Sequence, residues 1–541
     1  MSADANGGRS PRESGASRLP RLRNMFSRRN RRQLGAAAPA SHPAAADVAA
    51  DGRIATGKLA GLTMGSAILV LSWPILIESF LNTLVGLTDT VLAAGLENGR
   101  AATDAVGAAS YILWFVGLVI MAISIGATAL VSRAVGAGRL AVANAAVGQT
   151  LLLAVVSGVL VGAMIALIAR PVAVLYQMDE RATHDFVMYL RIVSLGVPMM
   201  SVTFCGIACI RGAGDNISPL LAMIVINLVN IVTSWVLSGV NLTRAVVIDG
   251  QIQTRTIIEN PFSFDMELGG IAAGTVIAQT VGALVVLLLL IRGGSGVRLI
   301  RRRLRPHVHT MMRLLRVGIP NFLETLGMWA GNFAVILIVG ALGAPGLLGA
   351  HIVTIRIEAI SFLPGFSMGV AAATLAGQYL GAGRPDLARR SVMVCTIIAS
   401  IFMGFMGALF VLVPREITGL FTPLPEHLDV VPKLLFITGL AQIPFAISIV
   451  LRQGMRGAGD TTAVMWITWI TTYAIRLPLV YILSGVEIPV PGWLGGGVIP
   501  APFGLEPSLA RIWIGLCIEV VLRAVFFWAR YITPGWTQQR V

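Results

Sequence analysis

The chain has 541 residues, of which 56% are hydrophobic and only 12% charged, and its mean hydropathy is +0.80. These values exclude an ordinary soluble protein and indicate a polytopic membrane protein. The formal net charge of +15 does not indicate a nucleic-acid partner, because the basic residues are concentrated outside the apolar stretches, most densely at 9–32 and 292–316. Such segments set membrane topology and contact anionic lipids.

Residues 1–57 are rich in Ala, Arg, Gly, Pro and Ser and cannot build a hydrophobic core, so we expect a disordered, basic cytoplasmic tail. The Arg-rich, acid-poor start also fits a transit peptide, and this second interpretation stays open.

Twelve apolar stretches long enough to cross a bilayer as helices follow the tail. They cover roughly 65–94, 105–132, 143–169, 186–209, 217–239, 269–291, 314–341, 347–376, 391–413, 430–453, 462–485 and 508–531. We predict an all-α polytopic membrane protein with twelve transmembrane helices in two six-helix lobes. The N-lobe covers 58–291, a basic cytoplasmic linker 292–313, the C-lobe 314–531 and a cytoplasmic C-terminal tail 532–541. The positive-inside rule then places both termini in the cytoplasm and the chain in the inner (plasma) membrane.

Three phrases of the first half return about 245 residues later, which indicates an internal duplication. Residues 130–139 (LVSRAVGAGR) recur as 375–384 (LAGQYLGAGR), and residues 211–215 (RGAGD) recur unchanged as 456–460. Residues 74–78 (PILIE) correspond to 320–324 (PNFLE). Duplicated halves in a membrane protein are typical of transport by alternating access. The Gly-rich phrases lack the Lys-Ser/Thr of a phosphate loop, so we interpret them as short turns between helices.

Five acids lie within the predicted spans, where a charge is costly and usually has a partner or a function. They are Glu78, Asp89, Glu324, Glu358 and Glu519. Glu519 precedes Arg523 by four residues, the spacing of a helical ion pair. Glu358 lies only two residues from Arg356, so each is expected to find another partner between helices. We interpret these last four residues as structural charges.

Asp89 has no basic residue within one turn of its own predicted helix. It must be solvated by a hydrogen-bond network in the bundle interior, or it binds a proton or a cation, and both interpretations remain open. Glu78 lies eleven residues earlier and therefore on nearly the same helix face, about 16 Å away along the axis. We predict that the two acids mark one wall of a cavity and that Glu78 takes part in ion coupling with Asp89.

Polar and aromatic side chains elsewhere in the spans are candidates for the substrate cavity. They are Asn82, Asn227, Tyr111, Trp114 and Phe115, with Glu324 from the second half. Helix packing explains the asparagines equally well, and aromatic residues in spans more often serve in packing or in the interfacial belt. The four cysteines all lie within spans and are expected to be buried thiols. We expect no disulfide, metal site or cofactor.

Residues 74–89, both Gly-Ala-Gly-Arg turns, both RGAGD turns and the phrase 356–366 together resemble the MATE (multidrug and toxin extrusion) family over roughly residues 60–531. The resemblance implies two six-helix lobes and export of organic, often cationic, compounds in exchange for H⁺ or Na⁺. It implies that Asp89 is the first-helix coupling carboxylate and that Asn230 is its fifth-helix partner. One turn after Asn230 the family often has an acid or amide, whereas this chain has Ser234.

The NorM-type branch also uses carboxylates in the seventh and tenth helices. Here the seventh-helix position falls near Met328 or Trp329, and the tenth span has no acid. The resemblance is therefore to the DinF-like branch, which implies coupling in the N-lobe and H⁺ rather than Na⁺ as the coupling ion. Glu324 either shares this coupling role or has the same structural role in the second half as Glu78 has in the first.

We thus predict a secondary antiporter, acting as a monomer among membrane lipids, that exchanges protons for small organic substrates and is not an enzyme. A flippase for lipid-linked saccharides is the alternative within the same superfamily. It would be expected to line its cavity with basic residues, whereas only Arg356 and Arg476 are counted within spans against five acids. A membrane-embedded enzyme is a weaker alternative, because no metal-ligand set, Ser–His pairing or cofactor loop occurs in the spans.

Overall fold

The computed structural model describes residues 59, 61–96, 98–176, 178–248, 251–262, 264–422, 424–489 and 497–539. All of them belong to one unit, Ala44–Val541. The tail predicted over 1–57 lies outside the described residues.

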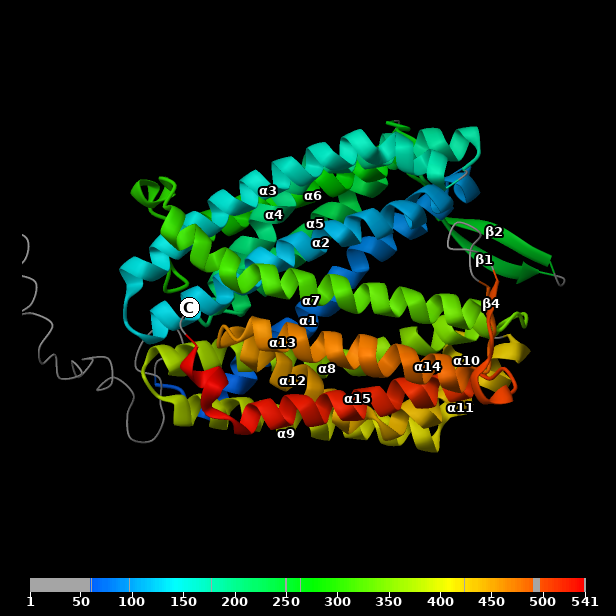
Figure 1. Ribbon diagram of the computed structural model, residues 1–541. Helices are drawn as coiled ribbons and strands as arrows, with labels where there is room; N and C mark the ends of the chain where they lie inside the picture. Colours follow the sequence, from blue (N-terminus) through cyan, green and yellow to red (C-terminus); the bar gives the residue numbers. More distant parts are fainter. Residues whose placement is uncertain are drawn as a thin grey trace, which may run out of the picture. The chain divides into compact units, whose positions relative to one another are not determined.

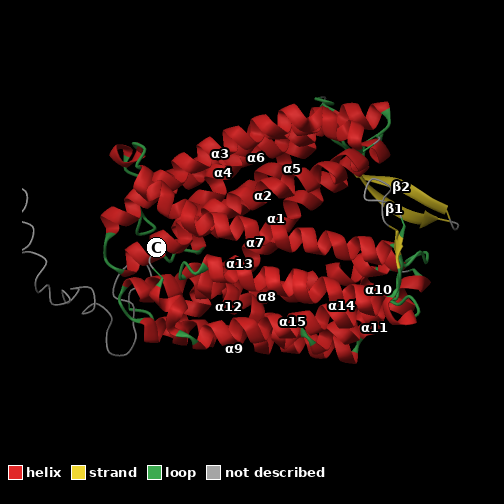
Figure 2. Ribbon diagram, in the orientation of Figure 1, coloured by secondary structure: helices red, strands yellow, loops and turns green. Residues whose placement is uncertain are grey.

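The N-lobe consists of six long helices and one β-hairpin. The helices are α1 (Met64–Ala94), α2 (Gly99–Gly136), α3 (Leu140–Leu175), α4 (Glu180–Gly212), α5 (Ile217–Ser238) and α6 (Glu267–Arg292). Side chains cap two of the helix starts: Thr63 accepts the backbone N–H of Ser66 at α1, and Asp179 accepts that of Ala182 at α4. The antiparallel strands β1 (Leu242–Ile248) and β2 (Gln251–Ile258) join α5 to α6, a hairpin that the sequence does not predict (Figure 2).

The C-lobe repeats this order with more interruptions. The linker contains the short helix η2 (Arg301–Leu304), and α7 (Val308–Gly340), α8 (Leu347–Gly381), α9 (Pro385–Leu412), α10 (Pro414–Phe421), α11 (Pro425–Leu440) and α12 (Gln442–Gly457) follow. Next come α13 (Thr461–Trp469), the π-helix η3 (Ile470–Arg476), α14 (Leu477–Ser484), the strands β3 (Ile488–Pro489) and β4 (Val498–Ile499), η5 (Pro502–Gly504), α15 (Leu509–Ile532) and η6 (Pro534–Gln538).

The predicted fold class is confirmed. Within the part of the chain that is described, eleven helices are long and apolar enough to cross a membrane, and α11 with α12 makes a twelfth as a pair bent by 57°. The sequence predicts that stretch as one span. It breaks at Ala441, where Gly439 packs so closely on Gly407 of α9 that a Cβ at Gly439 would lie 2.8 Å from the carbonyl oxygen of Gly407.

The two lobes meet along α2 and α7 and along the inner ends of α1 and α8. In Figure 1, α3, α4 and α6 lie on one side of the bundle and α9, α11 and α15 on the opposite side, with α2 and α7 between them. Gly126 and Gly318 allow backbone contact between α2 and α7. At the inner end, the first turns of α1 join α8 in one apolar cluster that includes Ile68, Leu71 and Leu375.

Candidate functional site

Asp89 lies in the last third of α1 and is only 5% exposed. The hydroxyl of Tyr189 from α4 donates to its Oδ2 at 3.1 Å, and the hydroxyl of Thr275 from α6 donates to the same oxygen at 3.0 Å. The carboxylate is therefore held between three helices by neutral donors.

Asn230 connects α5 to this cluster. Its Nδ2 donates to Thr275 Oγ1 at 3.1 Å and to Ser234 Oγ at 3.3 Å, while its Oδ1 is buried and accepts no hydrogen bond. Asn227, one turn earlier, donates to the carbonyl oxygen of Met223, and its own Oδ1 is likewise buried and unpartnered. We define Asp89, Tyr189, Asn230 and Thr275 as the Asp89 cluster. Within it, the side-chain oxygen of Asn230 can accept a further hydrogen bond.

No Lys, Arg or His side chain of the described residues comes within 4.0 Å of the Asp89 carboxylate. A buried carboxylate that lacks a cationic partner is costly, and neutral hydrogen-bond donors offset only part of that cost. Chemically, the Asp89 cluster is suited to bind a proton or a small cation.

The sequence contains no signal that would have assigned Tyr189 and Thr275 to this cluster. Each is one of several polar residues within an apolar span, and they lie 100 and 186 residues from Asp89 along the chain. Only the packing of α1 against α4 and α6 brings them together.

Glu78 lies outside the Asp89 cluster, and the cavity wall shared with Asp89 stays a prediction. The structure places Glu78 in an ion pair with Arg211, the arginine of the first RGAGD turn at the end of α4. The carboxylate is nearly buried at 5% side-chain exposure. The contact of this carboxylate is therefore with the first RGAGD turn and not with the Asp89 cluster.

Glu324 corresponds to Glu78 in the second half and is also paired rather than free in a cavity. Its Oε2 accepts from Arg456 of the second RGAGD turn at 2.6 Å, and its Oε1 accepts from Thr468 of α13 at 2.9 Å. The symmetric structural interpretation of the two glutamates therefore fits their contacts. The RGAGD turns supply the partner arginine in both lobes.

The predicted i,i+4 pair of Glu519 and Arg523 is present, at 2.7 Å. Arg476 from η3 adds a second ion pair to Glu519, also at 2.7 Å. Glu358 accepts from Thr438 at 2.7 Å, whereas Arg356 is exposed on α8, so the two indeed do not face each other.

The expectation that only Arg356 and Arg476 are basic within the spans is wrong. Arg452 and Arg456 lie on α12 among the helices of the C-lobe, and so does Arg523 on α15. Arg452 and Arg523 already fall within the predicted spans 430–453 and 508–531, and the count of basic residues missed them. Ion pairs with Glu324 or Glu519 hold Arg456, Arg476 and Arg523, so these three are not free to bind a pyrophosphate group.

The predicted aromatic candidates lie along α2 rather than at Asp89. Tyr111 is 75% exposed. Trp114 contacts Trp329 of α7 edge to face, with ring centroids 3.8 Å apart, and Phe115 contacts Phe322 of α7 at 6.2 Å. These aromatic pairs lie in the interface between the lobes. Asn82 is exposed on α1 and is not one of the residues that contact Asp89.

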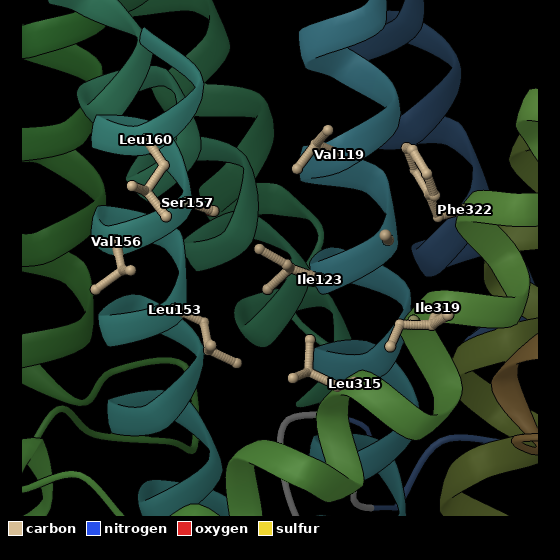
Figure 3. A pocket seen from close by; sticks show the side chains of 11 residues that line it. Val119, Ile123, Leu153, Val156, Ser157, Leu160, Leu315, Ile319 and Phe322 are labelled. Atoms are coloured by element: carbon tan, nitrogen blue, oxygen red, sulfur yellow. The ribbon is translucent and has the colours of Figure 1, made fainter. Parts of the chain in front are cut away.

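An apolar groove lies between α2, α3 and α7 (Figure 3). Its lining is Val119, Ala122, Ile123, Leu153, Val156, Ser157, Leu160, Leu315, Gly318, Ile319 and Phe322. Ser157 is the single polar side chain among them, so the groove suits acyl chains or apolar surface and offers no group that holds an ion.

Comparison with known proteins agrees with this arrangement. The MatE family profile matches residues 74–236 and again 320–482. A protein named "Probable multidrug resistance protein NorM" from Thermotoga maritima is 25% identical over 474 residues, covering 87% of this chain and 93% of its own. The multidrug resistance protein PmpM of Pseudomonas aeruginosa is 23% identical over 463 residues, covering 84% and 91%.

Two solved structures share the fold. A MATE structure in complex with MaD3S superposes with a TM-score of 0.73 at 19% identity, covering 86% of this chain and 95% of that one. An outward-facing multidrug resistance MATE family transporter of the MOP superfamily gives a TM-score of 0.71. At this identity the likeness concerns the fold alone.

Proposed function

The chain belongs to the MatE family of membrane transporters, and we propose that it is a proton-coupled antiporter that exports organic compounds from the cytoplasm by alternating access. Relatives named as multidrug resistance proteins support the substrate class. The duplicated halves and the contacts between their inner ends support the rocking mechanism.

The Asp89 cluster is the observation that carries this proposal. A proton on Asp89 removes its charge, so the hydroxyls of Tyr189 and Thr275 no longer point at an anion. The buried Oδ1 of Asn230, which accepts no hydrogen bond, is available to accept the new O–H. Protonation would therefore rearrange hydrogen bonds among α1, α4, α5 and α6 and weaken the attraction for a cationic substrate.

The inner ends of the lobes support an outward-facing resting state. Arg133 of α2 donates to the carbonyl oxygen of Ala458 in the second RGAGD turn at 3.0 Å. At the repeat-equivalent place, Gln378 of α8 donates to the carbonyl oxygen of Gly212 in the first RGAGD turn at 3.1 Å. We call these two contacts the inner clasp. It closes the side that the positive-inside rule assigns to the cytoplasm.

We further propose that H⁺ rather than Na⁺ is the coupling ion, as in the DinF-like branch, that the protein acts as a monomer, and that both termini lie in the cytoplasm at the inner membrane. The seventh-helix position near Met328 and Trp329 and the tenth span hold no acid, which supports the first point. The presence of both lobes in one chain supports the second.

Replacing Asp89 with Asn tests the coupling role. We expect Asp89→Asn to abolish uphill efflux of ethidium-like cations from cells while protein abundance stays near that of the unchanged chain. Asp104→Asn, which removes an exposed acid at the start of α2, is the matched control and should leave efflux intact. Efflux by Asp89→Asn at the unchanged rate would refute the proposal.

A further inference from the structure

The two lobes hold different charges at equivalent places. Residues 74–78 recur 246 residues later at 320–324, so Asp89 on the same helix corresponds to Val335. The C-lobe therefore lacks the acid of the Asp89 cluster.

Four arginines and three glutamates lie between the helices of the C-lobe: Arg452, Arg456, Arg476 and Arg523 with Glu324, Glu358 and Glu519. The buried Asp460 is paired separately with Arg530. Glu358 forms no ion pair within 4.0 Å with any of the four arginines. These four arginines thus share two glutamates.

Arg452 is the least satisfied of these arginines. Its Nη1 lies 3.8 Å from Glu324 Oε1, beyond hydrogen-bond distance, because Arg456 already occupies this carboxylate at 2.6 Å. The other contact of Nη1 is the sulfur of Met328 at 3.6 Å, and Nε is buried with no partner. The side chain is 12% exposed. This cation has only a distant counter-ion, which it shares with Arg456.

Asn321 adds a second unsatisfied group on the facing helix. It lies one turn before Glu324 on α7 and is 0% exposed, and neither atom of its amide has a hydrogen-bond partner. Spacings of three and four residues put Asn321, Glu324 and Met328 on one face of α7, the face that Arg452 contacts through Glu324 and Met328. A buried amide without a protein partner is expected to bind a water molecule or an ion.

We propose that Arg452 and Asn321 form a site for a monovalent anionic group, either the carboxylate of an amphiphilic substrate or a chloride ion. A guanidinium and an amide N–H are the donors that bind such a group. If the ligand is the carboxylate of a substrate, the proposal rests on the export function proposed above and specifies its substrate. That substrate would be zwitterionic, with its cationic end toward the N-lobe. The chloride form does not depend on the substrate.

The test uses the purified full chain and two dyes that differ by one charge. Rhodamine B has a carboxylate, and its ethyl ester is a cation without one. We expect Arg452→Gln to weaken binding of rhodamine B about tenfold, since one charge-assisted hydrogen bond is lost, and to change binding of the ester less than about twofold. Arg452→Lys should retain most of the difference between the dyes. Lys433→Gln, which removes an exposed positive charge of α11, is the control.

A second arm replaces chloride with gluconate and follows thermal unfolding. If chloride is the ligand, the unchanged chain loses thermal stability in gluconate and Arg452→Gln does not respond. Either result supports the site. The site is refuted if Arg452→Gln has the dye affinities and the chloride response of the unchanged chain. It is also refuted if Arg452→Gln weakens binding of both dyes by the same factor. The export function is tested separately. It is refuted if the unchanged chain does not transport the ester.

Discussion

At the scale of residues, the main feature is a buried ion pair that occurs once in each lobe. Glu78 with Arg211 and Glu324 with Arg456 each link the first helix of a repeat to the end of its fourth span. Burying two charges costs several kcal/mol per ion, which their mutual attraction offsets only when both partners are present. Both pairs therefore fix the position of an RGAGD turn.

We predict that Glu78→Gln lowers the free energy of unfolding by about 3 kcal/mol, because it leaves the guanidinium of Arg211 largely buried without a counter-ion. The measurement is thermal unfolding in detergent. Combining Glu78→Met with Arg211→Met should recover most of the loss, because it removes both charges. An unchanged unfolding temperature for Glu78→Gln would contradict the structural role.

The candidate site could be predicted from the sequence only in part. Asp89 was identifiable because an acid within an apolar span is rare and local. Its partners Tyr189 and Thr275 were not, because hydropathy and spacing do not report which helices pack together. For the same reason the sequence assigned Glu78 to Asp89, its neighbour on the same helix face, rather than to Arg211 on α4.

At the scale of helices, the spans and their number followed directly from the sequence, because length and apolarity decide whether a segment crosses a bilayer. The interruptions did not follow. The bend at Ala441 depends on a close approach between α9 and α11, and the π-helix Ile470–Arg476 places Arg476 against Glu519 of α15. Both are set by tertiary contacts.

The inner clasp gives a prediction about α2 and α8. A Cβ at Gly136 would collide with the carbonyl oxygen of Gln378, and a Cβ at Gly381 would collide with that of Arg133. We expect Gly136→Val to push the inner ends apart and shift the population toward the inward-facing state. Spin-label distances between positions 139 and 390 on the two lobes should lengthen. Gly107→Val, on the same helix with nothing within 4 Å of its Cβ, should leave them unchanged.

At the scale of the whole molecule, the duplicated unit has diverged in charge more than in fold. In the N-lobe, Asp89 is buried among neutral donors, whereas in the C-lobe Glu324 and Glu519 are each buried beside two arginines. Movement of an ion through the Asp89 cluster would then do the work of transport. One charge moving down 100 mV supplies about 2.3 kcal/mol, which sustains a gradient of roughly fiftyfold for a neutral or zwitterionic substrate.

The identity of that ion is a prediction for the assembled protein in a sealed membrane. We expect proteoliposomes to drive efflux with a pH gradient in sodium-free buffer and not with a sodium gradient at equal pH. Asp89→Asn should be inactive in both, which shows that the flux passes through the Asp89 cluster. Sodium-driven efflux that withstands a proton uncoupler and disappears in Asp89→Asn would contradict proton coupling. It would mean that the hydroxyls of Tyr189 and Thr275 turn their oxygens toward a bound cation instead of donating to the carboxylate.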